Sequence, residues 1–142
     1  MRYITILLFS IYLVHASPLE IEKEIYKIII QSIFPHKKSI TIWTDNPKEF
    51  DALIRLKNIK FITNPKYADI VFVSRENSFQ NIPPKKIIFV NSYILLKKHK
   101  NEAIGGFFWQ KGRPNIVFLR QNLQIHHINL SPDFQKYIED EL

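Results

Sequence analysis

Apolar residues along this chain alternate between helical spacing and short β-type runs, which predicts a protein of the α/β class. Isoleucines recur at helical spacing between Pro18 and Phe34, with Glu and Lys residues mostly on the other side. Ser17 is suited to cap this helix, Pro18 suits its first turn, and Pro35 ends it. The apolar face is predicted to carry Ile21, Ile25, Ile28, Ile29 and Ser32 or Ile33.

Shorter runs of β-branched and aromatic residues predict strands, separated by short helices and loops. The predicted strands are Ser39–Thr44, Ile59–Thr63, Ala68–Ser74 and Lys86–Val90. Ala68–Ser74 is apolar almost throughout, as expected of a strand covered on both faces. Predicted helices run from Asp45 or Asn46 to about Leu56 with Phe50, Leu53 and Ile54 inward, and from Asn91 or Ser92 to about His99. A last helix is predicted to be capped by Ser131, to have Phe134, Tyr137 and Ile138 inward, and to end in the acidic segment Glu139–Leu142. Arg75–Pro84 is predicted to be a surface loop.

The longest β-type pattern is a hairpin from Ala103 to Leu119. Two apolar runs, Ile104–Gln110 and Pro114–Leu119, flank the polar turn Lys111-Gly112-Arg113, where the central glycine tolerates a positive φ. Gly105-Gly106 near the start of the hairpin predicts a β-bulge or a close approach of backbones.

Together these elements predict a single-domain layered α/β sandwich. We expect a mixed sheet of five or six strands, partly parallel, with a C-terminal β-hairpin and helices on both faces. The length of 142 residues is enough for one such domain and too short for two ordinary ones. Residues 17–142 are predicted to form this domain.

The first 16 residues have the pattern of a secretory signal peptide. Arg2 precedes an apolar run, Ile4–Val14, and Val14-His15-Ala16 fits the small-residue pattern before a cleavage site. The run is short for a transmembrane helix, and the alternatives are an uncleaved anchor or a buried strand. Cleavage after Ala16 would leave a periplasmic chain without a membrane span.

Charge and composition narrow the classes of function. The formal net charge is +7 and the pI is about 9.6, but the lysines occur in scattered pairs such as Lys37-Lys38, Lys85-Lys86 and Lys97-Lys98. Scattered pairs favour a solvated surface over a nucleic-acid-binding arm, so no nucleic-acid partner is expected. The chain has no cysteine, which excludes disulfides, thiolate catalysis and cysteine metal sites.

Candidate catalytic residues are few, and the sequence predicts a protein that is not an enzyme and holds no cofactor or metal. It lacks a nucleotide-binding glycine loop and a Gly-x-Ser-x-Gly elbow. Asp45, Asp69 and Glu76 are predicted at or near the carboxyl ends of strands or in the loops that follow, where α/β proteins place their sites. The simpler interpretation makes Asp45 a helix cap and Asp69 a strand-edge residue. The histidines of the mature chain, His36, His99, His126 and His127, lack the spacing of a helical metal site and are expected on the surface or hydrogen-bonded.

One aromatic and basic cluster lies in the hairpin, Phe107-Phe108-Trp109 with Lys111 and Arg113. Strand alternation sends Phe107 and Trp109 to one face and Phe108 to the other. If the sheet is covered on both faces, these aromatic residues belong to the core. The alternative is an exposed aromatic patch beside two cations, which is the usual composition of a protein-interaction hot spot.

The order of these motifs resembles that of the YfiR-like family of small periplasmic proteins. The resemblance rests on a helix that ends at a proline (Ile25–Pro35), the strands Ile40–Trp43 and Ala68–Ser74, the strand and short helix Ile87–Leu96, and Ile104-Gly105-Gly106-Phe107 followed by Gly112-Arg113 and Phe118. It implies an α/β periplasmic domain without a catalytic role, which holds an inner-membrane diguanylate cyclase inactive and so lowers cyclic di-GMP.

Three departures from the family limit what the resemblance implies. The cysteines of some members are absent, so control by thiol redox chemistry does not carry over. The Asn that commonly closes the second strand of the hairpin is replaced near Leu119, and the region between Arg55 and Ala68 is short.

The first functional hypothesis is therefore a periplasmic regulatory protein that docks on the periplasmic part of an inner-membrane signalling protein, either a diguanylate cyclase or a sensor kinase. The predicted contact residues are Gly105, Gly106, Phe107, Phe108, Trp109, Lys111 and Arg113. The alternative is a small-molecule-binding sensor lobe that resembles one half of a periplasmic solute receptor. A homodimer is left open.

Overall fold

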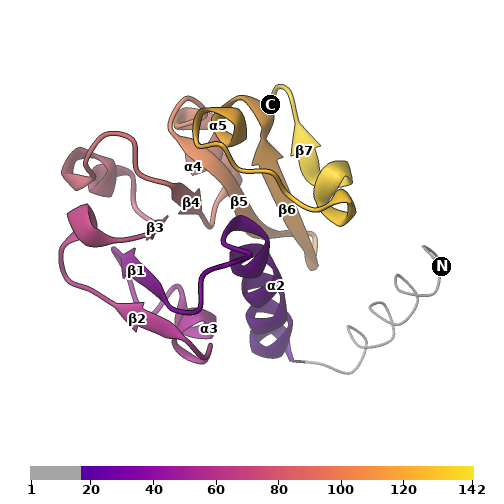
Figure 1. The fold of residues 1–142 in the computed structure, drawn as a ribbon. Coiled ribbons are helices and arrows are strands. Elements are labelled where there is room, and N and C mark those ends of the chain that lie inside the picture. The colour runs from indigo at the N-terminus through magenta and orange to yellow at the C-terminus, as the bar shows by residue number, and fades with distance from the viewer. Residues whose placement is uncertain (1–16) are drawn as a thin grey trace.

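Seven strands form one sheet in the order β2-β1-β3-β4-β5-β6-β7, shown in Figure 1. The structure is a computed structural model that describes residues 17–142, and the predicted signal peptide lies outside the described residues. The strands are β1 (Ile40–Thr44), β2 (Ile59–Phe61), β3 (Ile70–Val73), β4 (Ile88–Val90), β5 (Ala103–Gln110), β6 (Arg113–Leu119) and β7 (Ile138–Glu139).

The first five strands in the sheet, from β2 to β5, all run parallel to their neighbours. β6 is antiparallel to β5, and β7 is parallel to β6. Chain segments therefore enter β1 to β5 at one edge of the sheet and leave at the other. We call the first the amino edge and the second the carboxyl edge. Both names refer to the ends of the strands and not to the outermost strands of the sheet.

The remaining segments form helices, several of them very short. They are α2 (Pro18–Ile33), α3 (Asp51–Ile54), α4 (Tyr93–Lys98) and α5 (Arg120–Ile125), with 3₁₀ segments η1 (Pro65–Tyr67), η2 (Glu76–Asn81) and η3 (Pro132–Tyr137). Within the described range, none of these helices is long and apolar enough to cross a membrane.

The α/β class is confirmed, but the prediction of five or six strands is wrong. The last segment contributes a seventh strand, because Ile138 and Glu139 pair with Phe118 and Leu119 of β6, where the sequence predicted a helix. β7 pairs with only the last two residues of β6, so it covers that side of β6 at the end of the strand. The hairpin is therefore not the last element of the sheet.

α2 matches its prediction closely and lies across one face of the sheet (Figure 1). The Ser17 hydroxyl accepts a hydrogen bond of 3.3 Å from the Glu20 backbone N–H, as expected of an N-cap. The buried stripe is rotated from the predicted one and consists of Ile25, Tyr26, Ile29, Ile30 and Ile33. Ile28 was predicted inward, yet 39% of its surface is exposed.

Two apolar cores lie on opposite faces of the sheet. Under α2, the buried Tyr26 ring is surrounded by four phenylalanine rings, those of Phe50, Phe72, Phe89 and Phe107, with centroids 5.4–6.4 Å away. On the face covered by α4, the core includes Val71, Val73, Val90, Leu96 and Phe108. All four residues of β3 are fully buried, which confirms the strand predicted to be covered on both faces.

The helix predicted from Asp45 or Asn46 to Leu56 is mostly absent. Only the four residues of α3 are helical there. Phe50 and Leu53 are buried as predicted, but Ile54 is 53% exposed. The Asp45 carboxylate does not cap this helix, because it is bound to residues that follow β3.

Candidate functional site

The end of the β5–β6 hairpin extends beyond the strand beside it. β4 pairs with β5 only as far as Gly106, whereas β5 and β6 stay paired to Gln110 and Arg113. Among the described strands, the last four residues of β5 therefore have β6 alone as a neighbour at the carboxyl edge. Figure 1 shows this end of the hairpin beside α2, and the Trp109 indole N–H bonds to Glu22 of that helix.

The hairpin turn is tighter than predicted. Gln110 and Arg113 form the last cross-strand pair, which leaves only Lys111 and Gly112 in the loop, with φ of 51° and 73°. Two successive positive φ values are what a type I′ hairpin turn requires. The turn leaves the Lys111 and Arg113 side chains exposed to solvent.

The two glycines of β5 are buried where the strands approach most closely. A Cβ atom at Gly105 would lie 2.3 Å from the Val117 carbonyl oxygen, and one at Gly106 would lie 3.1 Å from Val90. The register slips by one residue at Ile104, as in a β-bulge. The predicted bulge and close approach are both confirmed. Both glycines are buried, so neither is accessible for contact with another protein.

The three aromatic residues of the hairpin have different surroundings. Phe107 packs on Tyr26 in the core under α2, whereas Phe108 packs on Tyr93 in the opposite core. Their opposite faces are as predicted, and both are buried, as the core interpretation expected. Trp109 is 36% exposed, and its indole N–H donates a 2.8 Å hydrogen bond to the Glu22 carboxylate of α2.

The pleat of the hairpin separates the exposed tryptophan from the arginine. Trp109 lies on the face covered by α2, while the cross-strand pair Gln110 and Arg113 shares the other face with Phe108 and Asn115. A hollow of about 710 Å³, open to solvent, is lined by Gln110, Lys111, Arg113 and Asn115. The sequence prediction missed Gln110 and Asn115, although the same alternation places both on the side of Phe108.

Asp45 lies at the carboxyl edge, where its carboxylate joins β1 to the segment after β3. It accepts 3.0 Å hydrogen bonds from the backbone N–H and hydroxyl of Ser74. It also accepts 2.8 Å bonds from the backbone N–H of Arg75 and the hydroxyl of Ser78. Because the lone pairs of the carboxylate are occupied by these donors, its role is structural. It links β1 to the segment that follows β3.

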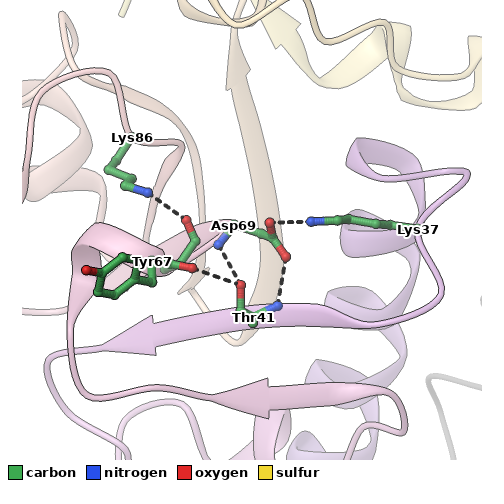
Figure 2. A network of polar contacts seen from close by, with 6 residues as sticks. Lys37, Thr41, Tyr67, Asp69 and Lys86 are labelled. Carbon is green, nitrogen blue, oxygen red and sulfur yellow. Dashed lines mark hydrogen bonds and ion pairs between the residues drawn. The ribbon is translucent and has the colours of Figure 1, made fainter.

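Asp69 joins the same two strands at the amino edge, as Figure 2 shows. Its carboxylate accepts hydrogen bonds from the Lys37 ammonium and, at 2.9 Å, from the Thr41 backbone N–H. The Thr41 hydroxyl in turn accepts a bond from the Asp69 N–H and donates one to the Tyr67 carbonyl. Burial raises the pKa of Asp69, but the bonds from Lys37 and Thr41 outweigh it, so the pKa is lowered. Asp69 precedes β3, so its predicted placement near a carboxyl end is wrong.

His99 is held between two carboxylates, and its ring stacks on Phe79. Its Nε2 atom lies 2.8 Å from Glu76 and its Nδ1 atom 3.4 Å from Glu102, while the two ring centroids are 3.5 Å apart. Burial and the neighbouring His127 lower the pKa of His126. Within residues 17–142, no group of three or more His, Asp or Glu side chains is placed to hold a metal ion.

Comparison with known proteins supports the fold and does not extend to function. No protein-family model matches the sequence, and no curated protein matches it. A solved structure described as a conserved domain protein from Vibrio cholerae O1 biovar eltor str. N16961 is similar, with a TM-score of 0.54 and 12% identity. The alignment covers 86% of this chain and 59% of that one. At this identity the likeness shows a shared fold alone.

Proposed function

We propose that this chain is a non-catalytic regulatory protein that docks on the periplasmic part of an inner-membrane signalling protein, a diguanylate cyclase or a sensor kinase. The observation that carries the proposal is the hairpin end, which extends past β4 and leaves Lys111 and Arg113 exposed. The kind of partner comes from the resemblance to the YfiR-like family.

The polar groups of the described sheet favour binding over catalysis. Asp45 and Asp69 are the carboxylates placed best for chemistry, and both are engaged by backbone, hydroxyl or ammonium donors. Their bonds join β1 to β3 and so stabilise the sheet. An exposed tip on a rigid two-stranded base, by contrast, is suited to enter a partner surface.

The composition of the tip indicates the chemistry of the surface it would bind. Lys111 and Arg113 are adjacent cations, and the residues around the hollow that they line are uncharged amides. Complementary charge on the partner would steer the encounter and fix its orientation. We therefore propose an acidic patch on the periplasmic domain of the partner, contacted chiefly through Arg113, a residue type enriched in hot spots.

Capture of membrane proteins by the C-terminally tagged full chain tests this proposal. Arg113→Glu should reduce the captured partner about tenfold or more, since it reverses a hot-spot charge. Lys60→Glu on the edge strand β2 is the matched control, because Lys60 is also exposed but lies at the far end of the sheet. Equal capture by both variants, or capture of no membrane protein by the wild type, would contradict the proposal. Trp109→Ala is a poorer probe, because Trp109 also packs on Phe107 and binds Glu22.

A small-molecule-binding sensor lobe is a second candidate, and one observation favours it. A shallow hollow at the tip, open to solvent, is lined by Gln110, Lys111, Arg113 and Asn115, whose side chains can donate hydrogen bonds to a small molecule. Its polar lining would suit an anionic ligand. A thermal-shift screen separates the two candidates, because a ligand that binds the folded state raises the melting temperature and a protein-docking surface gives no response to small molecules.

A further inference from the structure

The parallel topology brings together lysines that lie far apart in the sequence. Each segment that leads into one of the five parallel strands reaches the same amino edge. These segments carry Lys37-Lys38 before β1, Lys57 before β2, Lys66 before β3, Lys85-Lys86 before β4, and Lys97, Lys98 and Lys100 before β5. The scattered pairs of the sequence therefore become one basic edge.

Six of these lysines define what we call the lysine row: Lys38, Lys57, Lys66, Lys85, Lys97 and Lys100. All are exposed, and within the described part of the chain none of their ammonium groups forms an ion pair. Neighbouring strands lie about 4.8 Å apart, so the row is roughly 20 Å long. Its positive charges are without ion-pair partners among the described residues and are distributed along this edge of the sheet.

Two acidic groups near the row, those of Asp69 and Glu102, are already in contact with other side chains. The Asp69 carboxylate is bound by Lys37 and Thr41, and Glu102 lies 3.4 Å from His99. The loop that carries Lys100 is fixed from beneath, because the buried Asn122 amide donates 2.6 Å hydrogen bonds to the carbonyls of Lys100 and Ala103. The cations are thus presented to solvent from an ordered edge.

An exposed aromatic residue lies among these cations. Tyr67 is 68% exposed, and the Lys66 ammonium is 5.8 Å from its ring centroid. Its backbone is held by the Thr41 hydroxyl, and Figure 2 shows the ring turned away from the Thr41–Asp69 contacts. A tyrosine with an apolar ring and a polar tip, held outward beside lysines, suits the boundary between lipid headgroups and acyl chains.

We propose that the amino edge is a docking surface for an anionic phospholipid bilayer. The lysine row would lie against the headgroups, with Tyr67 among them. A row of point charges on separate loops fits a planar surface of mobile anions, whereas recognition of individual phosphates by proteins relies more on the bidentate geometry of arginine. The inference is independent of the hairpin, which ends at the carboxyl edge.

Vesicle sedimentation with the full chain tests this proposal. Vesicles of phosphatidylcholine alone are compared with vesicles that contain about one-third phosphatidylglycerol, at low salt. The edge variant is Lys66→Gln, Lys85→Gln and Lys97→Gln combined. The matched control, Lys27→Gln, Lys48→Gln and Lys136→Gln combined, removes the same charge from exposed lysines elsewhere. Because all proteins share the same first 16 residues, the comparison cancels any contribution of that segment.

We expect the edge variant to lose binding to the anionic vesicles by about a hundredfold, because each lysine near such a surface contributes about fivefold. The control variant should bind nearly as well as the wild type, and added salt should weaken the binding of both. Tyr67→Ser should weaken vesicle binding less than the edge variant does. This loss should persist when salt is added, because the contact of the tyrosine ring is not an interaction between charges.

Three results would overturn the proposal. One is equal binding by the edge and control variants, and another is wild-type binding that does not depend on phosphatidylglycerol. The third is an RNA oligonucleotide that binds more tightly than the vesicles with the same lysine dependence, which would assign the edge to nucleic acid. The vesicle comparison uses no substitution in the hairpin, so failure here is distinguishable from failure of the docking proposal.

Discussion

Two aspartates hold the same pair of strands, β1 and β3, one at each edge of the sheet, and their surroundings differ. At the carboxyl edge Asp45 accepts bonds from uncharged donors, the backbone and hydroxyl groups of Ser74, Arg75 and Ser78. At the amino edge Asp69 is bound by a lysine ammonium and by Thr41. Each aspartate thus links β1 to β3, but Asp45 does so through neutral donors at the carboxyl edge, and Asp69 does so beside several lysines at the amino edge.

The difference shows how one sheet presents two unlike surfaces. The loops around Asp45 supply hydroxyl and backbone N–H groups that bind its carboxylate, and the hairpin tip projects at the same edge with Lys111 and Arg113 exposed. Around Asp69 only Lys37 is neutralised, Lys86 donates a hydrogen bond to the Ala68 carbonyl, and the six lysines of the lysine row are exposed. The carboxyl edge therefore presents the projecting hairpin tip, while the amino edge presents the lysine row.

Gly105→Ala should have the largest effect on the hairpin that projects at the carboxyl edge, because the added methyl would force its two strands, β5 and β6, apart. The added methyl would lie 2.3 Å from the Val117 carbonyl oxygen, and backbone cannot yield as a flexible side chain can. We expect a loss of about 3 kcal/mol in the free energy of unfolding, measured by chemical denaturation. Gly112→Ala is the control: nothing lies within 4 Å of its Cβ position, so only its positive φ opposes the change. A loss of about 1 kcal/mol is expected there, and equal losses would contradict the crowding argument.

Asp45→Ala tests the hydrogen bonds between the Asp45 carboxylate and its uncharged donors at the carboxyl edge. It removes the acceptor of four donors, including the buried Ser78 hydroxyl, and leaves them without a partner. We expect a loss of about 2 kcal/mol in unfolding free energy. Asp51→Ala, which removes only an exposed i,i+4 pair with Arg55, should change stability by less than about 0.5 kcal/mol. If the two variants are equally stable, Asp45 does not fasten β1 to β3.

Asp69→Asn tests how much the charged Asp69 carboxylate stabilises the fold and how that stabilisation depends on pH. The pKa of Asp69 is lowered in the folded state, so the unfolded chain binds its proton first and the stabilisation is present above the unfolded pKa of about 4. It is lost as the pH falls through the lower folded pKa. We expect the variant to be about 1 kcal/mol less stable than the wild type near neutral pH, with the gap closing on acidification.

The matched control for that measurement is Asp140→Asn, which removes a carboxylate that is mostly exposed and paired with Arg120. Its effect should be near zero at every pH, because exposed ion pairs contribute little. A gap between wild type and Asp69→Asn that stayed constant from neutral to acidic pH would show that the charge of Asp69 does not contribute.

Local patterns in the sequence predicted most of the elements. The capped helix α2, the strand buried on both faces, the hairpin and the bulge at its start all follow from spacing within a single segment, where hydrogen-bonding and steric preferences act over a few residues. The alternation of Phe107 and Phe108 belongs to the same class of prediction. Ile54, predicted inward, is exposed, because α3 has only four residues and buries Ala52 and Leu53 instead.

The candidate site was only partly readable in the sequence. Of the residues predicted to bind a partner, Trp109, Lys111 and Arg113 remain exposed, while Gly105, Gly106, Phe107 and Phe108 are buried. Whether an aromatic run in a strand is core or surface depends on what covers each face of the sheet. In this chain α2 and α4 cover both faces up to Phe108, and that coverage is a property of packing between distant segments.

The sequence by itself determined most of the helices and strands, where the hairpin turn lies, and how apolar side chains alternate on each strand. The tertiary structure alone decided the strand order, the pairing of β7 with β6, the partners of Asp45 and Asp69, and the gathering of the lysines. The physical reason is range. Preferences for local structure act between near neighbours in the chain, whereas Asp69 meets Thr41 and Asp45 meets Ser74 across 28 and 29 positions of sequence. Only the competition among whole packed arrangements selects such contacts.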